Sequence, residues 1–285
     1  MTRSDWKVVI DGDSLTISSD AFTFTTCGAD ATQLEAVVAD LQSAVRGTYG
    51  QYCGLSRAAE MVGERWGFLI VRDLLVGPRS ATELHDGLPK TSAKVLSRRL
   101  NEMEFSGVVR RTGRADGAGD ERYELTEYGR ALEEAVMAFG RWGAASLAAP
   151  RPDDIVTDAS LMIALKATFL PETADDLSVS YELHIAGHVL NARIAGGVLE
   201  VGAGPLPGAD AVLHLGVALL PLLTGQATVT GALAGGEVRV DGDPAQLSRF
   251  VRMFQLPRLA APARRANEAS SMGSSKLLPL QGKGT

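Results

Sequence analysis

Cysteine, aromatic residues and long apolar runs are all scarce in this 285-residue sequence. Two cysteines, Cys27 and Cys53, cannot build a disulfide framework, so we expect two thiols in an intracellular protein. The apolar run Val217–Leu223 is far shorter than the roughly 18 residues of a membrane helix, and Pro221 interrupts it. The first thirty residues carry five aspartates, unlike a signal or transit peptide. We therefore expect a cytoplasmic protein without a membrane span.

Signatures of catalysis are also missing. The sequence has no glycine-rich phosphate loop, no nucleophile elbow and no dinucleotide-binding fingerprint. His184 and His188 are four residues apart, but they fall on a strand and beyond a turn, and no third metal ligand accompanies them. We expect no enzyme activity, no cofactor and no metal site.

What is present is a balance typical of a soluble globular chain, with 45% hydrophobic and 22% charged residues. The net charge of −6 is unevenly spread: residues 79–114 hold eight basic and four acidic side chains, whereas residues 150–257 hold six and twelve. A basic stretch inside an acidic chain is typical of a phosphate-backbone partner, although most charge runs are only solvated surface.

The first 47 residues form an extension of strands plus a helix by pattern. Trp6–Ile10 and Ser14–Ser18 flank Asp-Gly-Asp, which indicates a hairpin, and Ala21–Cys27 is typical of a third strand. Thr32 begins a capping box, and the helix after it is expected to end at Gly47. An accessory or dimerisation element is the default interpretation.

Residues 48–149 show a different order of elements. Apolar spacing and caps predict four helices, at Leu55–Glu64, Trp66–Val76, Ser80–Gly87 and up to about Phe105. Two strands at Val108–Arg111 and Arg122–Leu125 and a long closing helix capped by Thr126 follow. Pro89 enforces a break before a helix that Thr91 or Ser92 can cap. Helices followed by a β ribbon and a closing helix predict a winged helix-turn-helix domain.

The helix at 92–105 is the candidate DNA-recognition element. At 100° per residue its apolar side chains gather on one side and its polar ones on the other, and a Lys, Ser, Arg and Asn front fits the donors and acceptors of a major groove. The alternative is an ordinary surface helix with a solvated face. Arg110, Arg111 and Arg122 add charge from the ribbon, and further arginine and lysine side chains reach flanking phosphates. The expected DNA-contacting residues are Arg79, Lys90, Ser92, Lys94, Ser97, Arg98, Arg99, Asn101 and Arg114.

Several segments in this region are similar to the HxlR family of winged-helix transcriptional regulators. The residues that carry the resemblance are Tyr49–Cys53, Glu64–Trp66, Leu74–Arg79, Glu83-Leu84, Val95–Leu100 and Leu125–Gly129. The resemblance covers about residues 48–147 and implies a homodimer formed by the first and last helices of the region, reading double-stranded DNA at a pseudo-palindromic site. Family members usually begin close to Cys53, so the residues before it are an extension.

Cys53 allows two hypotheses. The resemblance places it where thiol-sensing members carry a redox cysteine, and a helix N-terminus at Gly54–Arg57 would lower its thiol pKa. The other hypothesis is a small buried residue at the dimer interface. Cys27 could pair with it only if the extension folds back.

Beyond a linker at 150–157, residues 158–257 predict an α+β domain. Leu161–Phe169 is helical by pattern, Leu177–Ile185 alternates with a period of two, and further short strands follow at glycine turns. Asp243-Pro244 opens a final helix, with Asp243 as its N-cap. Residues 258–285 are rich in Ala, Ser, Gly and Pro, and we expect a disordered tail.

This domain resembles the sterol carrier protein family of lipid-binding domains, through the strand Tyr181–Ile185, the segment Ala211–Leu223 and the run Gly236–Pro244. The resemblance implies a curved sheet under helices that enclose an apolar cavity, where a hydrophobic small molecule would bind because it leaves water. Each candidate can equally be plain core. The candidate lining residues are Phe169, Leu219, Leu220, Leu223, Leu233, Phe250, Met253 and Phe254.

The sequence as a whole thus predicts an α+β, homodimeric DNA-binding regulator, a repressor tuned by a hydrophobic small molecule in its C-terminal domain. The first alternative is a thiol-redox regulator acting through Cys53. The second is an apolar-ligand carrier or sequestering protein whose winged helix only mediates assembly.

Overall fold

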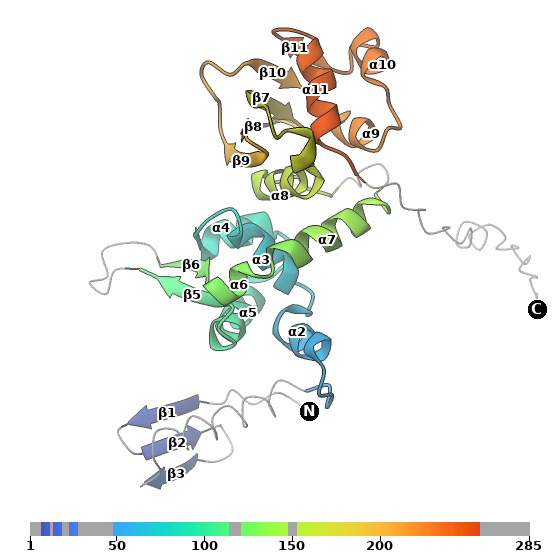
Figure 1. The fold of residues 1–285 in the computed structure, drawn as a ribbon. Helices are drawn as coiled ribbons and strands as arrows, with labels where there is room; N and C mark the ends of the chain where they lie inside the picture. The colour runs from blue at the N-terminus through green and yellow to red at the C-terminus, as the bar shows by residue number, and fades with distance from the viewer. Residues whose placement is uncertain are drawn as a thin grey trace, which may run out of the picture. The chain divides into compact units, whose positions relative to one another are not determined.

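The fold is drawn in Figure 1 from a computed structural model that describes residues 7–11, 14–18, 23–27, 48–113, 121–147 and 153–256. The chain divides into two compact units, Met1–Glu133 and Glu134–Thr285. The closing helix α7 (Glu133–Ala144) belongs to the second unit except for its first residue, and there Arg141 Nη1 donates to the carbonyl of Ala167 at 3.1 Å. The domain boundary that the sequence predicts at the 150–157 linker stays a prediction.

The N-terminal extension contains a three-stranded antiparallel sheet in the order β1-β2-β3, as the hairpin signal predicted. Its strands are β1 (Lys7–Asp11), β2 (Ser14–Ser18) and β3 (Thr23–Cys27). The helix expected at 32–47 lies outside the described residues, as does the tail after 256.

The second region is a winged helix-turn-helix in its element order. Its helices are α2 (Gly54–Val62), α3 (Gly67–Leu74), α4 (Ala81–Gly87), α5 (Ala93–Phe105) and α6 (Glu127–Arg130). Its strands are β4 (Arg79–Ser80), β5 (Val109–Thr112) and β6 (Arg122–Leu125), which form one antiparallel sheet in the order β4-β6-β5. The paired β5 and β6 form the ribbon that the sequence predicted.

The helix that Thr126 begins is not one long helix. Thr126 Oγ1 accepts from the Gly129 N–H at 3.0 Å, and a turn at 131–132 separates α6 from α7. Gly129 is required by close packing, because a Cβ there would lie 2.0 Å from the carbonyl oxygen of Val108. The Thr-Glu-Tyr-Gly sequence is thus explained by a cap and a contact with the start of the ribbon.

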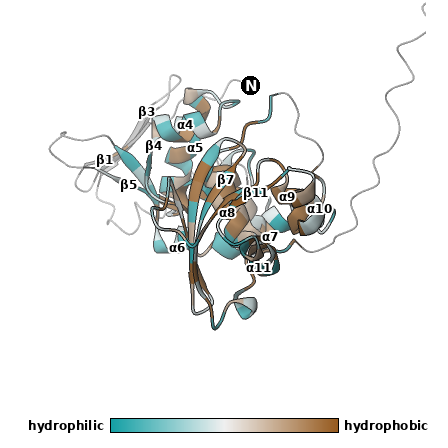
Figure 2. Cartoon of the chain, turned by 90° about the horizontal axis from the view of Figure 1, so that it is seen from above, coloured by the Kyte–Doolittle hydropathy of each residue, from teal (hydrophilic) through white to brown (hydrophobic). Residues whose placement is uncertain are grey.

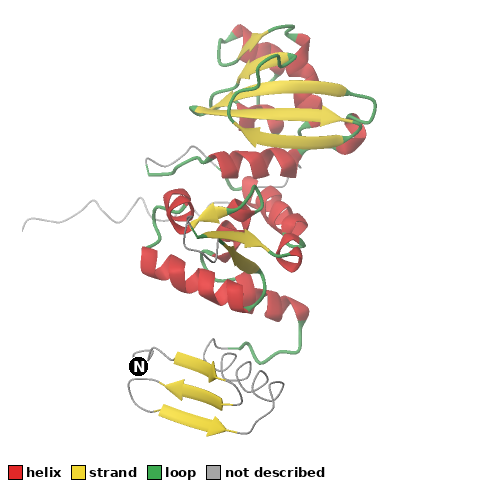
Figure 3. Ribbon diagram, turned by 90° about the vertical axis from the view of Figure 1, so that its left-hand side faces the viewer, coloured by secondary structure: helices red, strands yellow, loops and turns green. Residues whose placement is uncertain are grey.

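The C-terminal domain is built on a five-stranded sheet in the order β11-β10-β7-β8-β9, in which β10 runs parallel to β7 and the other neighbours are antiparallel. Figure 3 shows this sheet with helices on one side. The strands are β7 (Ser178–Ile185), β8 (His188–Ala195), β9 (Val198–Ala203), β10 (Ala211–His214) and β11 (Arg239–Asp241). The helices are α8 (Asp158–Thr168), the short 3-10 turn η1 (Pro171–Thr173), α9 (Leu219–Leu223), α10 (Val229–Ala234) and α11 (Ala245–Met253).

Strand β7 explains why only one face of this sheet is covered. Tyr181, Leu183 and Ile185 are at most 3% exposed, while Glu182 and His184 between them are partly exposed. The alternation of apolar and polar residues, visible in the colouring of Figure 2, therefore separates a buried face from a solvent-facing one. The period of two in the sequence predicted this strand.

Candidate nucleic-acid interface

Helix α5 is the element on which the candidate interface depends. Ser92 caps it, with its Oγ accepting from the Val95 N–H at 3.3 Å, so Ser92 rather than Thr91 begins the helix. Leu96, Leu100 and Met103 are at most 2% exposed and fix the inner face of the helix. Burial of these apolar side chains leaves the opposite face to solvent.

The solvent face carries the side chains that the spacing predicted. Lys94, Ser97, Arg98 and Asn101 are all exposed. Among the described residues we find no ion-pair partner for Lys94, and the Arg98 Nε lies 3.9 Å from a Glu102 oxygen, with half of the Arg98 side chain exposed. This face therefore presents two cations whose charge is hardly neutralised, next to a hydroxyl and an amide.

Arg99 is different, and its prediction as a phosphate contact is wrong. It is only 5% exposed, and its guanidinium forms ion pairs with Glu64 and, at 2.8 Å, with Glu102. Arg99 follows Leu96 by three residues and precedes Met103 by four, so it lies on the apolar side of the helix. Its role is to tie α5 to the segment after α2.

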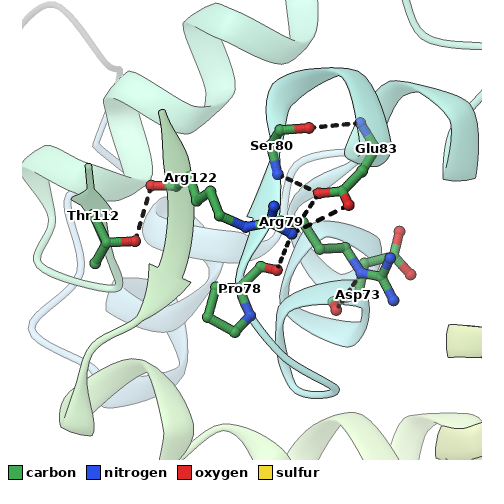
Figure 4. A network of polar contacts seen from close by, with 7 residues as sticks. All are labelled: Asp73, Pro78, Arg79, Ser80, Glu83, Thr112 and Arg122. Atoms are coloured by element: carbon green, nitrogen blue, oxygen red, sulfur yellow. Dashed lines mark hydrogen bonds and ion pairs between the residues drawn. The ribbon is translucent and has the colours of Figure 1, made fainter. Parts of the chain in front are cut away.

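A polar network at the start of α4 connects this helix to strand β6, as drawn in Figure 4. Ser80 Oγ accepts from the Glu83 N–H at 3.2 Å, and a Glu83 oxygen accepts from the Ser80 N–H at 2.7 Å. Arg122 of β6 donates to both Glu83 oxygens and, at 3.0 Å, to the carbonyl of Pro78. The Ser80 N–H and the cation of Arg122 lower the pKa of the Glu83 carboxyl. The network fastens the ribbon to the start of α4.

Arg79 has a structural contact that the sequence did not predict. It is half-buried, and its Nε donates to the carbonyl oxygen of Asp73 at 3.1 Å. The Asp73 side chain is itself buried beside Arg72, and this burial raises its pKa. Lys90, in the turn before α5, is exposed and has no ion-pair partner among the described residues. Phosphate contacts by Arg79 and Lys90 stay predictions.

The ribbon is less basic than its sequence indicates. Arg110 pairs with Glu124, its cross-strand neighbour, and Arg122 pairs with Glu83. Arg111 contacts Glu104, Glu121 and Asn101 at 2.8, 2.8 and 2.5 Å. Each of these three arginines, from which the sequence expected added positive charge, has a carboxylate partner that offsets that charge. Arg114 lies outside the described residues.

The turn between α4 and α5 is tightly packed. Thr91 is 5% exposed, and its Oγ1 has no hydrogen-bond partner in the structure. Its carbonyl oxygen lies 3.1 Å from His85 Nε2. The angle between the two helices is thus supported by a side chain of α4, which sequence spacing did not indicate.

Cys53 is exposed and occupies the N-cap position of α2. Hydrogen bonds from the backbone N–H groups of Ser56 and Leu55, together with the Ser56 hydroxyl, lower the pKa of its thiol. Because anions are stabilised at helix N-termini, this position favours the thiolate. Cys53 is exposed within one chain, and its burial at a dimer interface, the second hypothesis, stays a prediction.

The apolar candidates of the C-terminal domain form a packed cluster. Phe250, Met253 and Phe254 are at most 1% exposed. The Phe250 and Phe254 rings stack with centroids 4.4 Å apart, and Phe250 also meets Tyr181 edge-on at 5.4 Å. Phe169, Leu220 and Leu233 are only partly buried, whereas Leu219 and Leu223 are buried. That these residues line a ligand cavity stays a prediction.

The histidines of this domain pair with carboxylates one by one. His184 lies 2.8 Å from Glu182, and His188 lies 2.6 Å from Asp158. Within the described ranges, no group of three or more His, Cys, Asp or Glu side chains is arranged to hold a metal ion. Within the same ranges, none of the helices is both long and apolar enough to cross a membrane.

The chain is similar to known proteins over its winged helix-turn-helix region. The HxlR-like helix-turn-helix family matches residues 61–150. The HTH-type transcriptional regulator YvaP of Bacillus subtilis is 36% identical over 86 residues, which are 30% of this chain and 80% of the relative. YodB of the same organism is 32% identical over 88 residues, 31% of this chain and 79% of the relative.

Solved structures give likenesses of similar extent. A crystal structure of the regulator YtcD has a TM-score of 0.31 and 32% identity, and covers 32% of this chain and 94% of its own. A structure titled redox regulator HypR in its oxidized form has a TM-score of 0.32 and 25% identity, and covers 34% and 99%. On the family match and the identities to curated relatives, this chain belongs to the HxlR-like helix-turn-helix family of transcriptional regulators.

Proposed function

We propose that this protein is a homodimeric repressor that inserts α5 into the major groove of a pseudo-palindromic operator. The observation that carries the proposal is the exposed face of α5, where Lys94 and Arg98 stand beside Ser97 and Asn101 on a helix whose other face is buried. Arg and Lys donate hydrogen bonds to guanine, and the Ser and Asn side chains add hydrogen bonds to base edges. Lys90 in the preceding turn supplies a phosphate contact that positions the helix.

The test is a binding assay with DNA selected from a random-sequence library by the full-length protein. Lys94→Ala with Arg98→Ala is expected to weaken binding to the selected site by at least about 100-fold, since a base-reading side chain contributes about 1–3 kcal/mol. The matched control, Arg193→Ala with Arg252→Ala, removes the same charge from exposed positions of the C-terminal domain. Equal losses in both double variants would refute the role of α5.

The homodimer rests on exposed apolar side chains at the two ends of the family region. Tyr52 and Leu55 beside the start of α2 and Trp142 in α7 are each more than 70% exposed. Large exposed apolar groups of this kind are typical of protein interfaces. Leu55→Glu is expected to shift the protein from dimer to monomer in sedimentation, while Arg57→Ala on the same helix leaves the dimer intact.

The C-terminal domain supplies the regulatory part of the proposal. A hydrophobic molecule that binds one arrangement of the dimer more tightly than the other shifts the protein towards that arrangement. The affinity for the operator then changes only to the extent that the molecule's affinities for the two arrangements differ. Extracts of hydrophobic metabolites are expected to change retention of the operator in a gel shift, and mass spectrometry of the purified protein identifies what is bound. If no extract changes retention, the ligand-sensing part is lost and the DNA-binding part stands.

A second candidate, redox regulation, is favoured by one specific observation: Cys53 is exposed and its thiol pKa is lowered. Its thiolate would attack one oxygen of hydrogen peroxide, so that an S–O bond forms, the O–O bond breaks and hydroxide leaves. The sulfur is thereby oxidised by two electrons to a sulfenic acid. We expect peroxide to release the operator from the wild type and from Cys27→Ser, but not from Cys53→Ser. A response that survives in Cys53→Ser excludes this mechanism.

A further inference from the structure

Arg111 of β5 is surrounded on three sides by acceptors. Its Nε donates to Glu104 of α5 and its Nη1 donates to Glu121 at the foot of β6, both at 2.8 Å. Its Nη2 donates to Asn101 Oδ1 at 2.5 Å, and its guanidinium lies 5.5 Å from the centroid of the Tyr123 ring. Two carboxylates and an aromatic ring thus hold the guanidinium in one orientation.

This arrangement decides which way the Asn101 amide faces. A guanidinium has donors and no acceptor, so the group it contacts must be the carbonyl oxygen Oδ1 and not the amino group Nδ2. The Oδ1 therefore points at the ribbon, and the Nδ2 hydrogens are left as the donors of the amide on the exposed face of α5. The chemistry of the partner fixes the orientation.

The orientation has a consequence for base reading. An asparagine recognises adenine by accepting from N6 and donating to N7 at once, which needs Oδ1 and Nδ2 side by side at the base edge. Guanine offers two acceptors, N7 and O6, and suits a side chain that only donates.

We propose that Arg111 is a specificity-determining positioning residue: it retains Asn101 Oδ1 and presents Asn101 to the groove as a donor only, which selects guanine over adenine at one position of each half-site. This inference rests on the proposed insertion of α5 into the major groove. Arg111 itself touches no base. It acts through Asn101, and Glu104 and Glu121 keep it in place.

The test compares the binding preferences of three full-length proteins selected against the same random-sequence DNA library. Arg111→Met removes the donors and retains an unbranched stem beside Tyr123. The matched control is Arg110→Met, which removes the same charge from the neighbouring position of β5, where the partner is Glu124 of the ribbon. Because loss of a charge alone weakens binding to all sequences alike, the control separates charge from specificity.

For Arg111→Met we expect adenine to rise by about tenfold relative to guanine at one symmetry-related position, with the other positions unchanged, as a bidentate pair becomes possible. Arg110→Met retains the wild-type motif. If Arg111→Met and Arg110→Met select the same motif as the wild type, the inference is wrong although α5 still reads DNA. If the wild type itself selects no motif, or Lys94→Ala with Arg98→Ala binds normally, the proposed function has failed.

Asn101→Ala provides an independent measurement should Arg111→Met fold poorly. It removes the donor without touching the ribbon, so the guanine preference at the same position should fall to near-equal use of the four bases. A wild-type motif with adenine at the position that Asn101→Ala relaxes would overturn the inference, because Asn101 would then already read with both of its polar atoms.

Discussion

Most candidate residues of the winged-helix region are exposed to solvent, whereas those of the C-terminal domain are buried or partly buried. Lys94, Ser97 and Asn101 are exposed on α5, whereas Phe250 and Phe254 of the C-terminal domain are fully buried. A DNA-binding surface consists of side chains that stay exposed to solvent after folding, and helical spacing in the sequence predicts which side chains these are. An apolar site consists of the same residue types as a core, and only the space between them distinguishes the two.

The prediction with the largest expected effect tests whether the buried aromatic residues of the C-terminal domain are packed core or line a cavity. Phe250→Ala should lower the free energy of unfolding by about 3–5 kcal/mol if Phe250 is packed core, because it leaves a cavity against Tyr181 and Phe254. A residue that lines open space would lose far less. Denaturation followed by circular dichroism measures the change, and Leu220→Ala, at a half-buried position, should cost less than Phe250→Ala.

The second prediction distinguishes two adjacent arginines of α5, one expected to stabilise the fold and the other expected to bind DNA. Arg99→Met should destabilise the protein by about 1–3 kcal/mol, because it leaves Glu64 and Glu102 without their buried partner. Arg98→Met should leave stability nearly unchanged and weaken binding to DNA. Thermal denaturation and a salt titration of binding measure both properties. A reversed pattern would restore Arg99 as a DNA contact.

A smaller effect concerns the support behind α5. Ser80→Ala removes the side-chain acceptor that caps α4 and should cost about 0.5–2 kcal/mol. Thr82→Ala is the control, since Thr82 is exposed on the same helix. Equal denaturation midpoints for the two variants would show that the capping box adds nothing to the stability of the turn.

The smallest effect depends on pH. Burial raises the pKa of Asp73, so the folded protein retains a proton that the unfolded chain has already released. The contribution of Asp73 to stability is therefore lost as pH rises above the ordinary aspartate range of about 4. Asp73→Asn should gain stability over the wild type from about pH 4 towards neutral and match it at lower pH.

Urea denaturation across this pH range measures the difference. Asp86→Asn, at an exposed position of α4, corrects for the loss of one negative charge. A stability gain that is the same at every pH would mean that ionisation of Asp73 has no part in it.

Much of the fold could be predicted from the sequence because its signals are local. Alternation over Leu177–Ile185 predicted the strand that the structure has at Ser178–Ile185. The proline-enforced break predicted a helix starting at Thr91 or Ser92, and the structure shows Ser92 as its cap. The closing helix was predicted as continuous, since nothing local indicated the turn at 131–132 that separates α6 from α7. The close approach of Gly129 to Val108, two residues far apart in the sequence, was likewise not indicated by any local signal.

The sequence by itself determined the order of the elements, the amphipathic face of α5 and the family, because each depends on residues that are neighbours along the chain. Only the tertiary structure decided which arginines are free. Arg99 is neutralised by Glu64 and Glu102, Arg111 by Glu104 and Glu121, and Arg122 by Glu83, and most of these partners are brought near by packing. Charge is a property of composition, but its availability to a ligand is set by what folding places beside it.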